Sequence, residues 1–260
     1  MTFLRIALLG FIMVTALQAE SVESLRAGES YTYHVSWGPF FGAGEITLSA
    51  TNDINDGLER LHITTRTSTR GVIRLIFPFD GTGDSFFDRQ DGRLLEMRAT
   101  TKTRSDKTDA SIQFDYMNAE AVYTDYLKPA RSTTLAVPEG YFADFITALI
   151  QARHWNLAPG QSREVRVLFD DEFYHFKITA ERIEKISTAD GKQSALLLIP
   201  RMVGKPKGMF RKGGEVRVWI SNDSQHLPLR FEVKLKIGTA VVLLTAHAEP
   251  ENSQVALVTR

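Results

Sequence analysis

Apolar and polar residues alternate with a period of two along most of this chain, and this pattern constrains the fold more than any other feature. In residues 30–37, four apolar side chains fall on one face of the segment: Tyr31, Tyr33, Val35 and Trp37. Alternation rich in Thr, Tyr and Val is typical of strands with one covered face and one solvated face. It predicts an antiparallel sheet rather than a buried parallel one.

Further segments with the strand pattern follow throughout the sequence. They cover residues 44–50, 60–67, 94–103, 111–116, 121–126, 163–169, 173–185, 195–200, 215–221, 229–236 and 240–247. Turn residues such as Asn55-Asp56-Gly57 separate them. A sheet of about ten or more strands tends to curl or to split into two layers. We therefore expect a mainly β fold, built as a strongly curved antiparallel sheet, an open barrel or a two-layer β architecture.

Helical spacing interrupts the strands at about residues 140–155. An apolar stripe there consists of Phe142, Phe145, Ile146 and Leu149. It predicts one amphipathic helix packed on a sheet face. A shorter helical turn is expected at residues 70–76, ended by Pro78. The strands on either side of the long helix form either one domain that clasps it or two β-rich halves, and we favour a single domain over residues 20–260.

The first nineteen residues predict export. Arg5 precedes an apolar run over residues 6–17, and the small residue Ala19 stands before a polar segment. This is the pattern of a secretory signal peptide, and the run is shorter than the roughly 20 residues that span a bilayer. We expect cleavage after Ala19, with Ala16 and an uncleaved anchor as the alternatives. No later apolar stretch is long enough to cross a membrane, so the mature chain is not expected to span one.

Composition and motifs argue against several classes of function. The chain has no Cys, which excludes disulfides, thiol catalysis and Cys-type zinc sites. Lys plus Arg equals Asp plus Glu at 31 each, a balance that argues against nucleic acid as a partner. The His residues lack metal-pair spacing, and no nucleophile motif occurs. We expect no catalytic residue, no metal site and no cofactor.

Apolar residues outside the alternation are the most suggestive feature for function. Residues 71–79 hold six large apolar side chains in nine positions, and residues 39–42 place two Phe on an expected turn. The candidate ligand-binding residues are Phe40, Phe41, Val72, Ile73, Ile76, Phe77 and Phe79. Core filling is the competing interpretation of these residues. A curved sheet lined with aromatics and closed by a helix or loop would form a pocket for an acyl chain.

Four stretches of the chain carry a family resemblance. They are residues 31–38 with Ala43-Gly44, residues 84–88 with Gly92, Asp144-Phe145 with Arg153 and Gly160, and residues 218–223 with 227–230 and Gly238. Together they resemble an uncharacterised bacterial exported family, catalogued as domain of unknown function 3108, over about residues 25–248. Asn222 departs from the family pattern, which has an acidic residue there. The resemblance implies a β-rich envelope protein of a bacterium with an outer membrane, without an established activity, and it supplies no catalytic residues.

These features predict a non-enzymatic periplasmic protein that binds a lipidic or amphipathic envelope component or handles it as a chaperone. One alternative is a structural or adaptor module that binds another envelope protein. The other is a hydrolase that acts on glycans or lipids. If the candidate residues bind a ligand, Phe77→Asp or Phe79→Asp weakens ligand capture without unfolding the protein.

Overall fold

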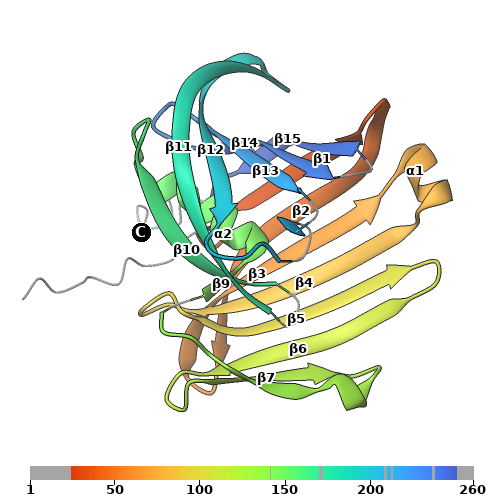
Figure 1. Ribbon diagram of the computed structural model, residues 1–260, viewed down its shortest axis with the longest axis vertical. Coiled ribbons are helices and arrows are strands. Elements are labelled where there is room, and N and C mark those ends of the chain that lie inside the picture. Colours follow the sequence, from red (N-terminus) through yellow and green to blue (C-terminus); the bar gives the residue numbers. More distant parts are fainter. Residues whose placement is uncertain are drawn as a thin grey trace, which may run out of the picture.

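One large curved sheet makes up most of the molecule. The computed structural model describes residues 25–140, 142–169, 172–207, 210–211, 213–235 and 238–250. The predicted signal peptide lies outside these residues. Within them, 15 strands form a single sheet in the order β8-β7-β6-β5-β4-β3-β2-β1-β15-β14-β13-β12-β11-β10-β9 (Figure 1). None of the described helices combines the length and the apolar character that crossing a membrane requires.

The chain builds this sheet as two runs of neighbouring strands. The first run contains β1 (Ser30–Trp37), β2 (Phe40–Asn55), β3 (Leu58–Thr69), β4 (Phe79–Asp88), β5 (Leu94–Thr103), β6 (Lys107–Asp115), β7 (Glu120–Asp125) and β8 (Thr133–Ala136). Helix α1 (Gly71–Ile76) lies between β3 and β4, and the 3₁₀ turn η1 (Pro129–Arg131) precedes β8.

The second run contains β9 (Phe142–Asp144), β10 (Ser162–Phe169), β11 (Glu172–Thr188), β12 (Gly191–Met202), β13 (Glu215–Ser221), β14 (Pro228–Leu235) and β15 (Gly238–Ala248). Neighbouring strands are antiparallel, except that β9 pairs with β10 in parallel. The last strand, β15, pairs with the first, β1, and so joins the two runs.

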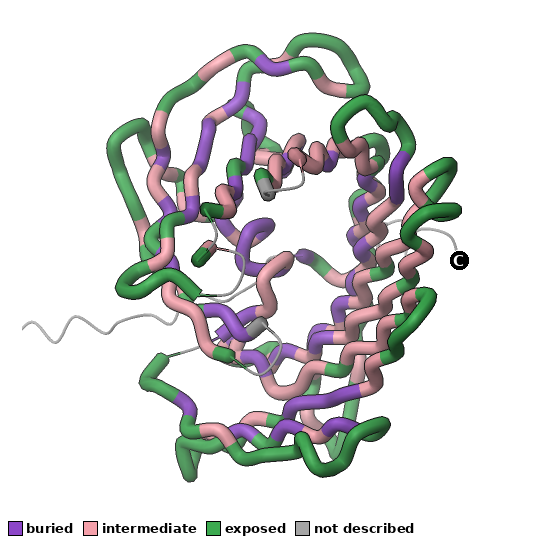
Figure 2. The backbone as a smooth tube through the Cα atoms, turned by 45° about the vertical axis from the view of Figure 1, so that its right-hand side comes forward, coloured by how far each residue is buried: buried purple, intermediate pink, exposed green. Residues whose placement is uncertain are grey.

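The two halves of the sheet face each other across a short helix. Helix α2 (Phe145–Gln151) continues into the 3₁₀ turn η2 (Ala152–His154), and four of its residues are buried. The same core cluster contains Ile63 and Phe87 from the first half and Phe176 and Val218 from the second. Figure 2 shows buried segments inside this curl and exposed hairpins at its ends. The predicted mainly β fold with a strongly curved sheet is confirmed.

The alternation in the sequence corresponds to the two faces of the sheet. On β1, Tyr31 and Tyr33 are buried and His34 is exposed. Leu48 of β2 is buried and pairs with Tyr31 of β1, so both side chains lie on the same face. Leu48 also pairs with Thr65 of β3, and Ile63, two residues from Thr65, is buried on that face as well. The residues that alternate with these buried ones along each strand therefore lie on the face away from the core.

The central helix is shorter than the sequence predicts. Of the span at about residues 140–155, residues 142–144 form strand β9, and α2 begins only at Phe145. The helix starts there because Asp144 has an extended backbone and its side chain accepts a hydrogen bond from the Thr147 backbone N–H. Phe142 therefore packs in a second buried cluster with residues of β6 and β7 rather than on the helix stripe.

We expect Asp144→Ala to lower the free energy of unfolding by about 1–2 kcal/mol through loss of this cap. The Asp144 Oδ1 atom accepts from Thr147 N at 2.8 Å, and Oδ2 accepts from the Ser85 hydroxyl at 3.1 Å. The cap therefore also ties α2 to β4. Urea unfolding measures the loss, and Asp144→Asn is the control, because Asn caps helices as well as Asp does. Equal losses in both variants would contradict a capping role.

Candidate functional site

All seven candidate residues gather at one end of the sheet, where α1 lies beside the β1–β2 hairpin (Figure 1). Phe40 and Phe41 begin β2 immediately after a turn. Val72, Ile73 and Ile76 belong to α1, Phe77 is its C-terminal cap, and Phe79 begins β4. The Arg70 backbone N–H donates to the Ala43 carbonyl oxygen at 2.8 Å and links the two segments.

Most of these side chains are exposed, and they form a surface that we call the apolar rim. It consists of Phe40, Phe41, Val72, Leu75, Ile76 and Phe77, whose exposed fractions range from 41% for Phe40 to 89% for Phe41. Leu75 belongs to the same run but was not among the candidates predicted from the sequence. Ile73 and Phe79 are half-buried. Clusters of exposed apolar side chains mark interaction sites, whereas single exposed apolar residues are common on any protein surface.

The arginines of the α1 segment hold its apolar side outward. Arg74 donates two hydrogen bonds to the Asp80 carboxylate, at 2.9 and 2.8 Å, and Arg70 pairs with Glu45. Arg104 donates to the Leu75 carbonyl oxygen at 2.6 Å. No residue of α1 is buried. An amphipathic helix on a protein surface normally buries its apolar face, whereas α1 is attached through its charged side.

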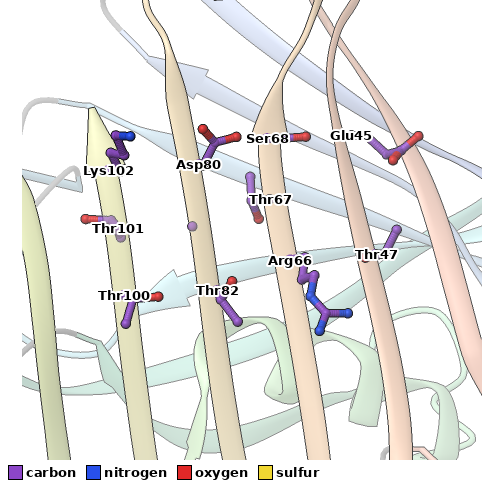
Figure 3. Close-up of a pocket in the computed structure, with 11 residues that line it drawn as sticks. Glu45, Thr47, Arg66, Thr67, Ser68, Asp80, Thr82, Thr100, Thr101 and Lys102 are labelled. Atoms are coloured by element: carbon purple, nitrogen blue, oxygen red, sulfur yellow. The ribbon is translucent and has the colours of Figure 1, made fainter. Parts of the chain in front are cut away.

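A polar pocket lies on strands β2 to β5 of the sheet (Figure 3). Its volume is about 390 Å³. Two rows of paired residues cross strands β2 to β5 there: Thr47, Arg66, Thr82 and Thr100 in one row, and Glu45, Ser68, Asp80 and Lys102 in the other. By alternation both rows lie on the face away from the core. The carboxylates that hold α1, Glu45 and Asp80, thus also line this pocket.

The pocket carboxylate Asp80 is held in its ionised form. The hydrogen bonds from Arg74 lower the pKa of Asp80, and the positive charges of Arg74 and Lys102 act in the same direction. Two further pockets are lined in part by residues of η2. None of the seven candidate residues lines any of the three pockets.

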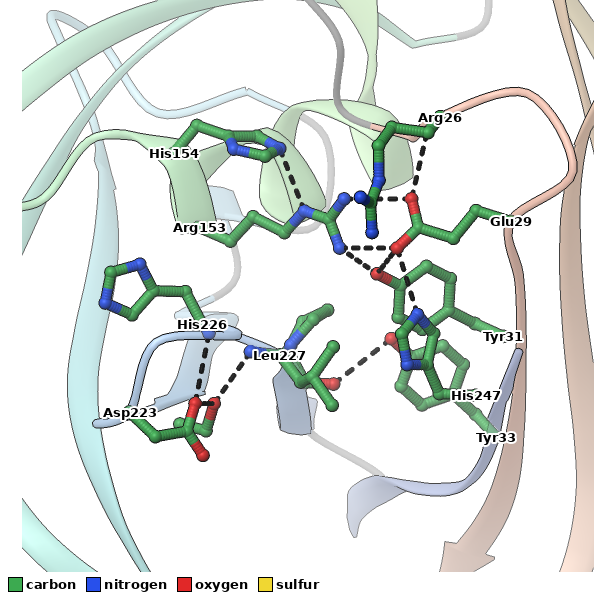
Figure 4. A network of polar contacts seen from close by, with 12 residues as sticks. Arg26, Glu29, Tyr31, Tyr33, Arg153, His154, Asp223, His226, Leu227 and His247 are labelled. Carbon is green, nitrogen blue, oxygen red and sulfur yellow. Dashed lines mark hydrogen bonds and ion pairs between the residues drawn. The ribbon is translucent and has the colours of Figure 1, made fainter. Parts of the chain in front are cut away.

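A second constellation, which we call the Glu29–Arg153 network, lies in the core where η2 meets β1 and β15 (Figure 4). Arg153 donates to both carboxylate oxygens of Glu29, at 2.8 and 2.9 Å, and both residues are buried. The Arg26 backbone N–H, at 2.9 Å, and the Tyr31 hydroxyl, at 2.7 Å, donate to the same carboxylate. His247 Nε2 lies 2.9 Å from Glu29 Oε1. The network therefore ties the first and last strands to the end of the helix.

Hydrogen bonds from its neighbours keep the buried Glu29 carboxylate ionised. Burial alone would raise the pKa of the Glu29 carboxyl, but hydrogen bonds from Arg153, Arg26 and Tyr31 outweigh it and lower the pKa to about 2. Burial raises the pKa of the Tyr31 phenol well above its usual range. A general base works best with a pKa near the operating pH, so neither group is suited to proton transfer at neutral pH.

The Glu29–Arg153 network predicts a specific acid sensitivity. A carboxyl whose pKa is lower in the folded than in the unfolded protein stabilises the fold above its unfolded pKa, near 4.3, and loses that contribution as the pH falls. We expect the gap in unfolding free energy between the wild type and Glu29→Gln to shrink by about 3 kcal/mol between pH 5 and pH 2. Urea titrations across this range measure the gap. A gap that stays constant with pH would contradict the assignment.

The sequence signal that could have found this network is the family resemblance. Tyr31 and Arg153 lie in two of the stretches that carry it. Beside the network, the Tyr33 hydroxyl donates to the Pro228 carbonyl oxygen at 3.1 Å. Asp223 accepts hydrogen bonds from the Ser221 hydroxyl and from the backbone N–H groups of Gln225 and His226. Glu29 and His247 lie outside those stretches, and neither was predicted as a site residue.

Comparisons with known proteins support the fold and leave the activity open. The family model described as protein of unknown function (DUF3108) matches residues 32–245. No curated protein sequence matches the chain.

Among solved structures, a β-barrel-like protein of domain of unknown function DUF1849 from Brucella abortus has 9% identity and a TM-score of 0.54, over 86% of this chain and 98% of that one. At this identity the likeness concerns the fold alone. A candidate lipoprotein from Parabacteroides distasonis has 9% identity and a TM-score of 0.33, with 86% and 96% of the two chains covered. A candidate exported protein with a YmcC-like fold from Bacteroides fragilis has 8% identity and a TM-score of 0.34, with 86% and 97% covered.

Proposed function

The chain belongs to the DUF3108 family of proteins of unknown function, and we propose that it is a non-enzymatic periplasmic protein that binds a lipidic amphiphile through the apolar rim. The observation that carries the proposal is the orientation of α1. Ion pairs with Glu45 and Asp80 hold the helix so that Val72, Leu75 and Ile76 face solvent. The predicted signal peptide supports the location, because it would deliver the mature chain to the compartment where envelope lipids are handled.

Burial of the rim would supply ample free energy for binding. Moving one large apolar side chain out of water contributes about 1.5–3 kcal/mol. The rim offers six such side chains, of which Phe41 and Leu75 are 89% and 75% exposed. Ordering the ligand removes several kcal/mol of this gain. A dissociation constant of 1 μM corresponds to about 8 kcal/mol, so the ligand must contact most of the six side chains to bind in the micromolar range.

The surroundings of the rim favour a lipid over an apolar protein surface. Arg70 and Arg74 flank the apolar side chains and remain 57% and 45% exposed although both are paired. Short amphipathic segments that combine Phe and Leu with Arg are typical of protein regions that contact lipid head groups and acyl chains together.

An adaptor that binds another envelope protein is the second candidate function, and one observation favours it. Strand β8 (Thr133–Ala136) pairs with β7 and, among the described residues, with no strand on its other side. Its residues are mostly exposed. An open edge of this kind can accept a strand from a partner protein.

Native mass spectrometry tests the two candidates against each other. The mature protein would be purified gently from the periplasm, and its bound lipids would be identified after extraction. We expect a stoichiometric lipid adduct. A mass that corresponds to the protein alone, together with a stable co-purifying protein, would contradict lipid binding and favour the adaptor.

A further inference from the structure

We propose that the polar pocket next to the apolar rim receives the anionic head group, a phosphate ester, of the amphiphile that the rim binds. This inference rests on the proposed function and assigns a second part of the same ligand. Three features of the structure carry it: the position of the pocket, the charges left over in it, and the hydroxyl groups that line it.

The pocket and the rim adjoin each other through shared residues. Glu45 and Asp80 line the pocket, and the same two carboxylates hold Arg70 and Arg74 of the α1 segment. An amphiphile whose acyl chain lies on the rim thus has its polar end within reach of strands β2 to β5. The volume of about 390 Å³ falls within the range of roughly 300–1,000 Å³ that is usual for small-ligand sites.

The charge balance in the pocket favours an anion. Both carboxylates are neutralised by the arginines of the α1 segment. The two cations of the pocket, Arg66 and Lys102, form no ion pair within 4.0 Å in the part of the chain that the structure describes. Lys102 contributes to the low pKa of Asp80 only through its charge. Arg66 and Lys102 are therefore available to bind an anionic group, and Arg is well suited to phosphate.

The hydroxyl groups around the two cations also lack protein partners. Thr47, Ser68, Thr82 and Thr100 line the pocket, and their hydroxyls form no hydrogen bond with any other described residue. Each hydroxyl can donate to a phosphoryl oxygen. None of the described lining residues is aromatic, so the pocket offers no platform on which a sugar ring would stack. These groups fit a phosphate ester better than a neutral sugar.

Binding of two amphiphiles with the same acyl chain tests the inference. Lysophosphatidylglycerol carries the phosphate ester, and monoacylglycerol lacks it. Calorimetric titrations below the critical micelle concentrations would compare the wild type with Arg66→Gln/Lys102→Gln. We expect the wild type to bind the lysophospholipid roughly tenfold more tightly than the monoacylglycerol, and the variant to lose this preference. Its affinity for monoacylglycerol should stay unchanged.

A matched control removes two lysines from the other half of the sheet. Lys185→Gln/Lys192→Gln, in β11 and β12, carries the same change of charge and should keep the preference. The inference is overturned if the pocket variant binds lysophosphatidylglycerol as tightly as the wild type. It is also overturned if glycerol 3-phosphate alone binds as tightly as the lysophospholipid, because the pocket would then serve a free phosphate ester. If neither amphiphile binds the wild type, the proposed function itself fails.

Discussion

Arg153→Met is expected to lower the free energy of unfolding by about 3–5 kcal/mol, because it leaves a buried carboxylate without its cation. Glu29 is fully buried and receives two hydrogen bonds from Arg153, at 2.8 and 2.9 Å. The same substitution removes the contacts of η2 with Glu29 and with Tyr31 of β1. Equilibrium unfolding in urea measures the effect, and a loss of this size is a large part of the total stability of a typical domain.

Two control variants separate charge burial from a general effect of losing an arginine. Arg201, which is paired with Glu181 at 3.0 Å, has a side chain that is 61% exposed, and Arg201→Met should change stability by no more than about 0.5 kcal/mol. The double variant Glu29→Gln/Arg153→Met should recover part of the loss, because it removes both charges. If Arg153→Met proves as stable as Arg201→Met, the network does not hold the fold together.

Phe41→Asp/Ile76→Asp is expected to weaken binding of lysophosphatidylglycerol by at least about 100-fold. Each substitution removes about 1.5–3 kcal/mol of apolar burial and places a negative charge against the ligand. The two side chains are 89% and 65% exposed, so the variant should fold and unfold like the wild type. Calorimetric titration measures the affinity, and circular dichroism with urea unfolding checks the fold.

The matched control places the same charges at the opposite end of the strands. Ile54 and Met117 are 70% and 97% exposed, and they lie near the far ends of β2 and β6. Ile54→Asp/Met117→Asp should leave the affinity within about twofold of the wild type, since surface substitutions away from a site have small effects. Equal weakening by both double variants would contradict a role for the apolar rim in particular.

Local pattern was sufficient to predict much of the sheet. The segments 30–37, 94–103 and 215–221 coincide with β1, β5 and β13. Buried and less buried residues alternate in the first part of β1, whereas Val218–Ser221 of β13 are all buried. The alternation of apolar and polar residues did not predict strand β4, because Gly81 and Gly83 interrupt its apolar positions. Pairing with β3 on one side and β5 on the other imposes its conformation; such context often outweighs intrinsic strand preference.

The two candidate sites differ in what the sequence could reveal. The apolar run of residues 71–79 was visible, but its exposure was not, because a core segment and a binding surface have the same composition. Ion pairs of Arg70 and Arg74 with residues of β2 and β4 decide its orientation. The Glu29–Arg153 network joins residues 124 and 218 positions apart. Only the pairing of β1 with β15 and the position of η2 bring them together.

Photo-crosslinking locates the bound acyl chain on the protein. A lysophosphatidylglycerol with a diazirine in its acyl chain would be bound to the wild-type protein, activated by light and located by peptide mapping. If the apolar rim binds the lipid, crosslinks form on the peptides that carry Phe40, Phe41 and residues 72–77, and Phe41→Asp/Ile76→Asp loses them. Crosslinks confined to peptides around α2 or in the second half of the sheet would contradict lipid binding at the rim.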